Sequence, residues 1–373
     1  MNRNSQSENK DKIELDLTKI VSTLENEISS LEAIFLVGSF GRNEGSVLHY
    51  ENSPRIINDY DLVIVVSENN NSFDVDRIRR DLEEELSVRQ VDITCYTKNK
   101  LKSLSYTMYS YDLKYASRLL YGKKEILDLI PEMDKTRMPV LEAIRPLLLF
   151  PVSLLQAYPN PRENMSEIDL FWSYQQVVKS ILGWSTAILI LNGKYDPSYS
   201  QRQKNIKELY KDNKEEAFLV EKATEFKLNP TIKPIKEEDF FNFWTESTLV
   251  HLEKTIEVLS KFYKTGSNLE DISSKYRYSI RNTLKMIVTS ILNIDKRSMI
   301  NIEIGQLYLC KALCVQNSTT KDDLLNLALI EAFEAKKYSG YSEEINKENL
   351  IESFILMNPN SSNWFRKGNK LSY

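Results

Sequence analysis

The stretch Ala33-Ile34-Phe35-Leu36-Val37-Gly38-Ser39-Phe40-Gly41-Arg42 decides the fold of this chain. Its first five residues form a short apolar run, which is typical of a strand buried on both faces. The run ends at once in the pair Gly38-Ser39. Glycine permits a sharp turn and a close approach of the backbone to a ligand, and the serine adds a hydroxyl at the same place. The segment therefore predicts a buried strand that leads directly into a ligand-binding turn.

Acidic side chains open or interrupt the next two apolar runs. The run Asp59-Tyr60-Asp61-Leu62-Val63-Ile64-Val65-Val66 begins with two aspartates, and Val91-Asp92-Ile93-Thr94-Cys95-Tyr96 contains a third. Because successive side chains of a strand point to opposite faces, Asp59 and Asp61 are expected on one face. Carboxylates held close together repel one another unless a cation neutralises them, and Mg²⁺ prefers oxygen ligands of this kind. The pattern predicts a site for two Mg²⁺ ions, or Mn²⁺ in their place, at Asp59, Asp61 and Asp92.

Each of these motifs is weak alone, because Gly-Ser is common and Asp-Tyr-Asp is more often a turn or a solvated strand end. In this order, and each beside an apolar run, they resemble the DNA polymerase β-like nucleotidyltransferase superfamily. That superfamily includes the minimal and aminoglycoside-type nucleotidyltransferases and the bacterial cGAS-like synthases. The resemblance covers the first third of the chain. It implies an α/β (α+β) nucleotidyltransferase domain with a mixed sheet flanked by helices.

The resemblance also implies roles for individual residues. Asp59, Asp61 and Asp92 would be the catalytic metal ligands, with Asp92 also the base toward an acceptor hydroxyl. Gly38 and Ser39 would hold the phosphates of a nucleotide such as ATP, and Arg42 is a further nucleotide-binding candidate. Between the two motifs the chain departs from the family pattern, because residues 48–57 are predicted to form an inserted loop.

The length of 373 residues exceeds what one hydrophobic core usually organises. We predict a disordered tail over 1–11, a catalytic domain over 12–135 and a helical domain that closes the cleft over 136–266. Residues 267–373 are predicted to extend this helical domain or to form a second helical bundle, with a polar tail from 358. Helices are predicted over 12–31, 73–87, 166–191, 214–226 and 237–263.

The helix over 166–191 has clear end signals, with Ser166 as its N-cap and Gly193 after its last turn. Within it, Lys179 interrupts the apolar rows. Helical domains of this superfamily often present a lysine to the triphosphate, so Lys179 is predicted to bind the nucleotide. The alternative is a surface lysine whose stem lies along the apolar face.

A polar and aromatic loop follows this helix. Similar loops border the acceptor pocket in small-molecule nucleotidyltransferases, so Tyr195, Tyr199 and Arg202 are predicted to bind the acceptor. The alternative is a connection between helices whose tyrosines cover the core.

The composition is ordinary, with 42% hydrophobic residues, 27% charged residues and a net charge of -4. A mildly acidic chain is not expected to be a dedicated nucleic-acid binder, although a local basic cleft is compatible with it. Cys95, Cys310 and Cys314 do not have the spacing of a zinc site or of a disulfide framework. Residues 1–12 lack the apolar core of a signal peptide, and the apolar runs 147–155 and 181–191 are too short to span a bilayer. We expect a cytoplasmic protein without a membrane partner.

These observations predict a metal-dependent nucleotidyltransferase that transfers NMP from an NTP to a hydroxyl of a small acceptor, such as a sugar, an antibiotic or a metabolite. Pyrophosphate would be the second product. Two alternatives stay open at this point. One is a synthase of a nucleotide second messenger, or an enzyme that modifies tRNA or protein. The other is a catalytically inactive, nucleotide-binding regulatory protein.

Overall fold

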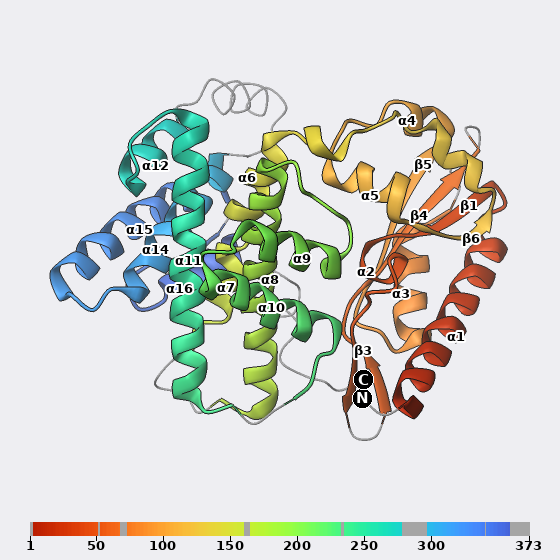
Figure 1. Ribbon diagram of the computed structural model, residues 1–373, viewed down its shortest axis with the longest axis horizontal. Coiled ribbons are helices and arrows are strands. Elements are labelled where there is room, and N and C mark those ends of the chain that lie inside the picture. The colour runs from red at the N-terminus through yellow and green to blue at the C-terminus, as the bar shows by residue number, and fades with distance from the viewer. Residues whose placement is uncertain are drawn as a thin grey trace.

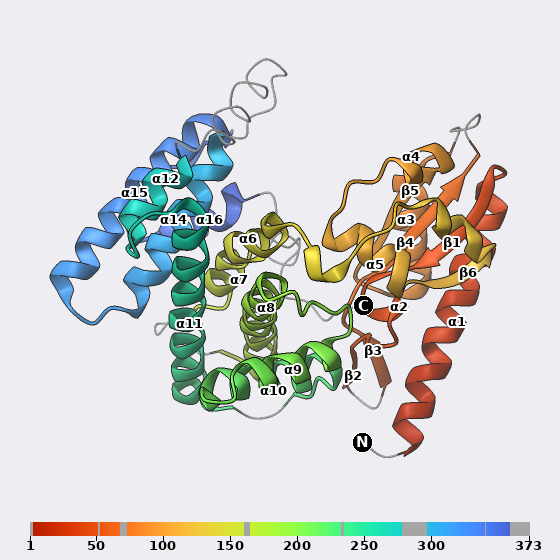
Figure 2. The same ribbon diagram turned by 45° about the horizontal axis from the view of Figure 1, so that its top comes forward.

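A computed structural model describes residues 3–50, 53–67, 73–159, 165–232, 235–277, 297–339 and 341–358. The strands and the first helix lie at one end of the molecule, and the last helices lie at the other end (Figures 1 and 2). Nowhere in these ranges is a helix both long enough and apolar enough to cross a membrane. The polar tail predicted from residue 358 lies, except for Asn358, outside the described residues.

The sheet-containing part runs from the first helix to residue 137. Its elements are α1 (Arg3–Glu27), β1 (Leu31–Leu36), α2 (Gly38–Gly41), β2 (Val47–Tyr50), β3 (Ser53–Ile56), β4 (Tyr60–Val66), α3 (Val75–Leu86), β5 (Val91–Thr97), α4 (Lys98–Lys102), α5 (Met108–Ala116), β6 (Arg118–Gly122), and the 3-10 helices η1 (Lys124–Leu129) and η2 (Lys135–Arg137).

The main sheet is mixed and has the strand order β5-β4-β1-β6. β1 pairs antiparallel with both β4 and β6, whereas β4 and β5 run parallel. Alternate residues of β1 and β4 face two different apolar clusters, as the period of a strand requires. Ile34 and Leu62 pack with residues of α1 and α3, whereas Phe35 and Val63 pack with residues of α4, α5 and η1. The sheet is therefore covered on both faces, as the apolar runs predict. The α+β class is what the structure has.

Two segments differ from their predicted structure. α1 begins at Arg3, so most of the segment predicted as a disordered tail is helical. The insertion predicted as a loop over 48–57 contains a β-hairpin in which Val47 pairs with Ile56. At its base, Leu48 and Ile57 pack against Phe171 and Trp172. The hairpin gains its apolar partners from a helix more than a hundred residues later, and its own sequence does not show them.

The second part is helical. Its elements are α6 (Val140–Leu149), α7 (Pro151–Gln156), α8 (Glu167–Leu191), α9 (Tyr199–Leu209), α10 (Lys214–Leu228), α11 (Glu237–Tyr263), α12 (Leu269–Arg277), α14 (Arg297–Cys314), α15 (Ser318–Ser339) and α16 (Leu350–Met357).

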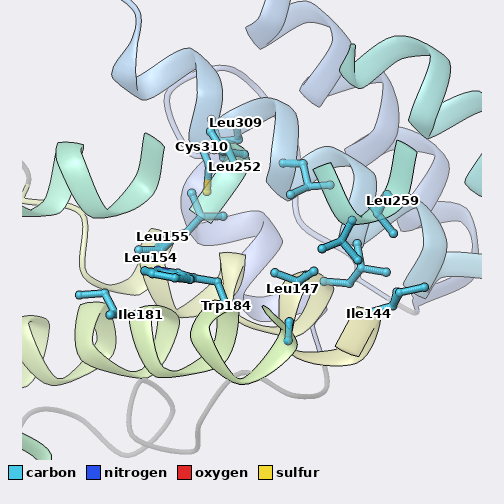
Figure 3. Close-up of a cluster of buried hydrophobic side chains, with 14 of the residues drawn as sticks. Ile144, Leu147, Leu154, Leu155, Ile181, Trp184, Leu252, Leu259, Leu309 and Cys310 are labelled. Atoms are coloured by element: carbon cyan, nitrogen blue, oxygen red, sulfur yellow. The ribbon is translucent and has the colours of Figure 1, made fainter. Parts of the chain in front are cut away.

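α8 forms the centre of this helical part. Its N-cap, Ser166, accepts a hydrogen bond from the backbone N–H of Asp169, and Gly193 follows its end with a φ of 63°, as its end signals predict. Trp184 is fully buried and points from α8 toward Leu154 and Leu155 of α7 (Figure 3). The same apolar cluster continues through α14 and α15 to α16, so the last helices extend the first helical bundle.

Candidate active site

The three predicted carboxylates meet at one end of the parallel strand pair. In β4 and β5, Asp61 lies directly opposite Asp92. Asp59 precedes Asp61 by two residues and therefore shares its face of the sheet. One oxygen of each carboxylate lies within 4.8 Å of an oxygen of the other two. The convergence expected from the sequence is present, and the role of these carboxylates as metal ligands stays a prediction.

The acidic triad, Asp59, Asp61 and Asp92, is electrostatically costly as it stands. Burial, followed by the charges of Asp59 and Asp92, raises the pKa of Asp61 to about 7, although Arg42 and Lys227 partly oppose the shift. The side-chain amide nitrogen of Gln90 lies 2.9 and 3.0 Å from the two oxygens of Asp92 and orients that carboxylate. Half-buried oxygen donors that repel one another fit a hard divalent cation, because the cation would remove the repulsion.

The turn after β1 closes over this triad. Gly38 has a φ of 63°, and a Cβ atom built on it would lie 2.0 Å from Oδ2 of Asp61. Both facts require glycine at this position. The backbone N–H of Val37 donates to the carbonyl of Asp61 at 2.8 Å, which fixes the turn to β4. Ser39 is buried beside it, and its proposed contact with phosphate, like that of Gly38, stays a prediction.

A single carboxylate ties this turn to the helical part. Glu44 accepts hydrogen bonds from the hydroxyl of Ser198 at 2.8 Å, the backbone N–H of Tyr199 at 2.8 Å and that of Ser200 at 3.1 Å. These donors lie at the N-terminus of α9, where the helix dipole favours a negative charge. α9 is therefore held in a fixed position relative to the turn and the triad.

Arg42, predicted to bind the nucleotide, takes part in the same contact region. Its Nη1 lies 3.3 Å from Oδ2 of Asp112, and its Nε lies 3.8 Å from Glu44. Its guanidinium carbon is 5.5 Å from the centre of the Tyr199 ring. In the structure this arginine joins the turn to α5 and α9, and a contact with nucleotide stays a prediction.

A cavity of about 310 Å³ lies between the hairpin base and the helical part. α6, α8, α9 and α10 supply most of its wall. The lining residues are Ser46, Ile57, Asn58, Met108, Pro146, Phe150, Gln175, Val178, Lys179, Leu182, Gly183, Thr186, Tyr199, Arg202, Phe226 and Lys227. Three of the predicted site residues, Lys179, Tyr199 and Arg202, therefore share one cavity that begins next to Asp59 at Asn58.

Lys179 is half-buried on α8 and lines this cavity. Burial lowers the pKa of its ammonium group, Asp59 opposes the shift, and the positive charges of Arg89 and Lys227 add to it. Lys179 is therefore close enough to Asp59 for their charges to interact. Lys179 was predicted either to face the nucleotide or to lie at the surface. Its position in the cavity wall agrees with the first interpretation.

Tyr199 lies among three cations. The guanidinium carbon of Arg202 is 4.2 Å from the centre of its ring, and the Lys227 ammonium is 5.5 Å from it, as is Arg42. Burial alone would raise the pKa of Tyr199, but the charges of Lys227, Arg202 and Arg42 outweigh burial and lower it. Cations over an aromatic face are attracted to the ring, so Tyr199 helps to hold them together.

Tyr195 departs from its prediction. Its side chain is fully buried, and its hydroxyl donates to Oδ1 of Asp112 at 2.8 Å. Its ring packs edge-on against Tyr111, and it is not among the residues of the cavity wall. The segment predicted as a loop continues as α9 from Tyr199 onward. It contains both alternatives, because Tyr195 covers the core whereas Tyr199 and Arg202 line the cavity.

Sequence reasoning missed Lys227 and the capping role of Glu44. Lys227 lies near the end of α10, where a lysine is ordinary, and only the packing of α10 brings it to Tyr199. Glu44 follows the glycine turn, and its partners lie more than 150 residues later. No local pattern indicates either contact.

Comparisons with protein-family models, curated proteins and solved structures gave no match for this chain. The chemistry of the site is therefore inferred from its own residues. Three convergent carboxylates can hold divalent cations, and a cationic cavity beside them can hold an anionic or electron-rich ligand.

Proposed function

We propose that this chain is a metal-dependent nucleotidyltransferase that transfers NMP from an NTP to a hydroxyl of a small acceptor. The observation that carries the proposal is the pairing of Asp61 with Asp92 across two parallel strands, with Asp59 on the same face and Gly38 directly above Asp61. Bound divalent ions would neutralise phosphate charge at this place.

The residues of the chain have separate tasks in the proposed reaction. The acceptor oxygen attacks the α-phosphorus, the bond from that phosphorus to the bridging oxygen breaks, and pyrophosphate leaves. Asp92 takes the proton of the acceptor hydroxyl, and Gln90 keeps its carboxylate oriented. Gly38 would let the backbone approach the phosphates closely, and Lys179, which interacts electrostatically with Asp59, would add a positive charge to the site.

The size of the cavity supports a small acceptor. Its volume of about 310 Å³ is at the lower end of the range for small-molecule sites. A macromolecular acceptor would need an open groove instead, because a tRNA end or a protein loop does not fit inside such a volume with the rest of its chain.

The test is incubation of the protein with each labelled NTP, Mg²⁺ and fractionated small-molecule extract. We expect extract-dependent pyrophosphate release and a labelled acceptor. Asp59→Asn and Asp61→Asn should each reduce the rate by about a hundredfold or more, the scale for loss of a preorganised electrostatic group. Asp76→Asn, on the exposed face of α3, is the matched control and should keep the full rate.

Three outcomes would count against the proposal. Undiminished pyrophosphate release in both triad variants would refute the metal assignment. Nucleotide binding without any pyrophosphate release, in every extract fraction, would favour the regulatory alternative. Labelled product from NTP alone would instead identify a second-messenger synthase.

A further inference from the structure

The charges on the cavity wall are all of one sign. Lys179, Arg202 and Lys227 line the cavity, and no aspartate or glutamate is among its lining residues. Within the described ranges, neither Lys179 nor Lys227 makes a close ion pair, although Asp59 acts on Lys179, and Lys227 acts on Asp61, at longer range. Three cations that line one partly enclosed space, with no carboxylate in its wall, indicate a site for an anion.

The arginines next to the cavity also have unused hydrogen-bonding capacity. Arg202 is 8% exposed, and it donates to Oγ1 of Thr186 at 2.8 Å and to the carbonyl of Pro197 at 2.9 Å. Its Nε is buried without an acceptor among the described residues, and the same is true of Nε of Arg42. A buried donor without an acceptor is costly, and an anion beside Tyr199 would supply one.

Much of the remaining cavity wall is apolar and aromatic. Ile57 and Met108 belong to the sheet-containing part, and Phe150, Val178 and Phe226 come from the helices. A ligand that fills the cavity would therefore combine an apolar or aromatic body with an acid group.

The position of the cavity favours the acceptor over the nucleotide. Gly38, Ser39 and Asp61, proposed to engage the nucleotide phosphates and their ions, are not among its lining residues, whereas Lys179 lines it and also interacts with Asp59. The cavity instead starts at Asn58, whose side-chain oxygen accepts a hydrogen bond from the backbone of Ser46 at 2.9 Å. A nucleotide that lies along the turn leaves this space for the second substrate.

We propose that the acceptor is a small anion, with a hydroxyl on an apolar or aromatic body and a carboxylate or phosphate group bound by Lys227 and Arg202 beside Tyr199. This inference rests on the proposed function, because only a transferase has an acceptor. It excludes polycationic acceptors such as aminoglycosides, because the wall offers them cations and no carboxylate. An uncharged acceptor would offer these cations no counter-charge inside the cavity.

The test measures binding without turnover and uses three probes of one shape. These are 4-hydroxybenzoate, neutral 4-hydroxybenzyl alcohol and cationic 4-hydroxybenzylamine, titrated into the full chain by calorimetry. We expect the anion to bind at least about tenfold more tightly than the neutral probe, the scale of a charge-assisted hydrogen bond, and the cation to show no binding. Phenyl phosphate, added as a fourth probe, distinguishes a phosphate from a carboxylate.

Variants on one helix locate the site. Lys227→Met should remove the preference for the anion, and its backbone, whose carbonyl accepts the hydroxyl of Ser46, is unchanged. Lys222→Met, an exposed lysine of the same helix, is the matched control and should behave like the unmodified protein. Circular dichroism of each variant checks that its helices are intact.

The possible results decide the question. Equal binding of the neutral or cationic probe, no binding of any probe, or an anion preference that survives Lys227→Met would each overturn the inference. ATP at saturation should leave the affinity for 4-hydroxybenzoate unchanged, and competition would instead assign the cavity to the nucleotide phosphates. Since pyrophosphate is not measured, an inactive protein could still bind the anion, and an active protein could fail to do so.

Discussion

The sheet-containing part and the helical part face each other at the candidate active site with side chains of opposite charge. The sequence determines these two sides in different ways. On the sheet side, Asp59, Asp61 and Asp92 converge within a span of about thirty residues, through the register of two adjacent strands. On the helical side, Lys179 of α8 and Lys227 of α10 lie almost fifty residues apart in the sequence. The difference teaches that strand register can place a site locally, whereas a site between helices depends on how the helices pack.

The largest expected effect comes from removing one negative charge from the acidic side. In the protein without added metal, Asp61→Asn should be more stable than the unmodified chain at pH 8 by up to about 4 kcal/mol. The reason is that the pKa of Asp61 is raised from its ordinary 3.8 to about 7, so ionisation of this carboxylate opposes folding. The stability of the unmodified protein should fall as the pH rises from about 4 to about 7, and the variant should lack this component.

Urea denaturation in EDTA at pH 4, 6 and 8 measures this difference. Asp76→Asn, whose carboxylate is exposed, is the control and should follow the unmodified protein at every pH. Added Mg²⁺ should raise the stability of the unmodified protein and have little effect on Asp61→Asn. Parallel pH curves for the unmodified protein and Asp61→Asn would contradict the assigned electrostatic cost.

The acidic side could be predicted from the sequence because the two-residue period of a strand determines which side chains share a face. Once the run from Asp59 to Val66 is recognised as a strand, the shared face of Asp59 and Asp61 follows. A parallel neighbour then needs only the correct register to bring Asp92 alongside. The bounds of α8 and α11 were predictable for a similar reason, because end signals and apolar periods lie within the helices themselves.

The basic side could not be predicted in the same way. Lys227 looks like any lysine near a helix end, and its contact with Tyr199 depends on the angle between α9 and α10. Tyr195 and Tyr199 are the same type of residue, four positions apart, yet Tyr195 is in the core and Tyr199 lines the cavity. The hairpin was predicted as a loop because its apolar partners are Phe171 and Trp172 of α8.

The next prediction concerns the turn that lies against the acidic side. Gly38→Ala should destabilise the protein by about 2 kcal/mol, because alanine is strained at a left-handed φ and its Cβ would displace the carboxylate of Asp61. We also expect loss of pyrophosphate release, since the acidic triad would be disturbed. Chemical denaturation and the labelled-NTP assay measure the two effects.

Gly193→Ala separates backbone strain from the clash. Gly193 has the same φ of 63°. The nearest atom to an added Cβ would be the carbonyl oxygen of Thr136 at 3.2 Å, and neither residue belongs to the acidic triad. It should cost about 1 kcal/mol, the lower end for left-handed strain, and keep the full rate. Equal losses of stability and of rate in both variants would show that the contact between Gly38 and Asp61 has no special role.

The smallest expected effect tests the difference between Tyr195, before α9, and Tyr199, in its first turn. Tyr195→Phe removes the hydrogen bond from its hydroxyl to Asp112, whose carboxylate also lies 3.3 Å from Arg42. We expect a loss of about 1 kcal/mol, typical of one hydrogen bond, because Arg42 still compensates the buried carboxylate. Binding of 4-hydroxybenzoate should not change, since Tyr195 does not line the cavity. Tyr199→Phe is the matched substitution four residues later. The charges of Lys227, Arg202 and Arg42 act on its phenol at the cavity wall, so loss of this hydroxyl should lower the affinity. The opposite result, in which Tyr195→Phe weakens binding and Tyr199→Phe does not, would contradict the assignment. The anion site would then have to lie near Tyr195 and Asp112.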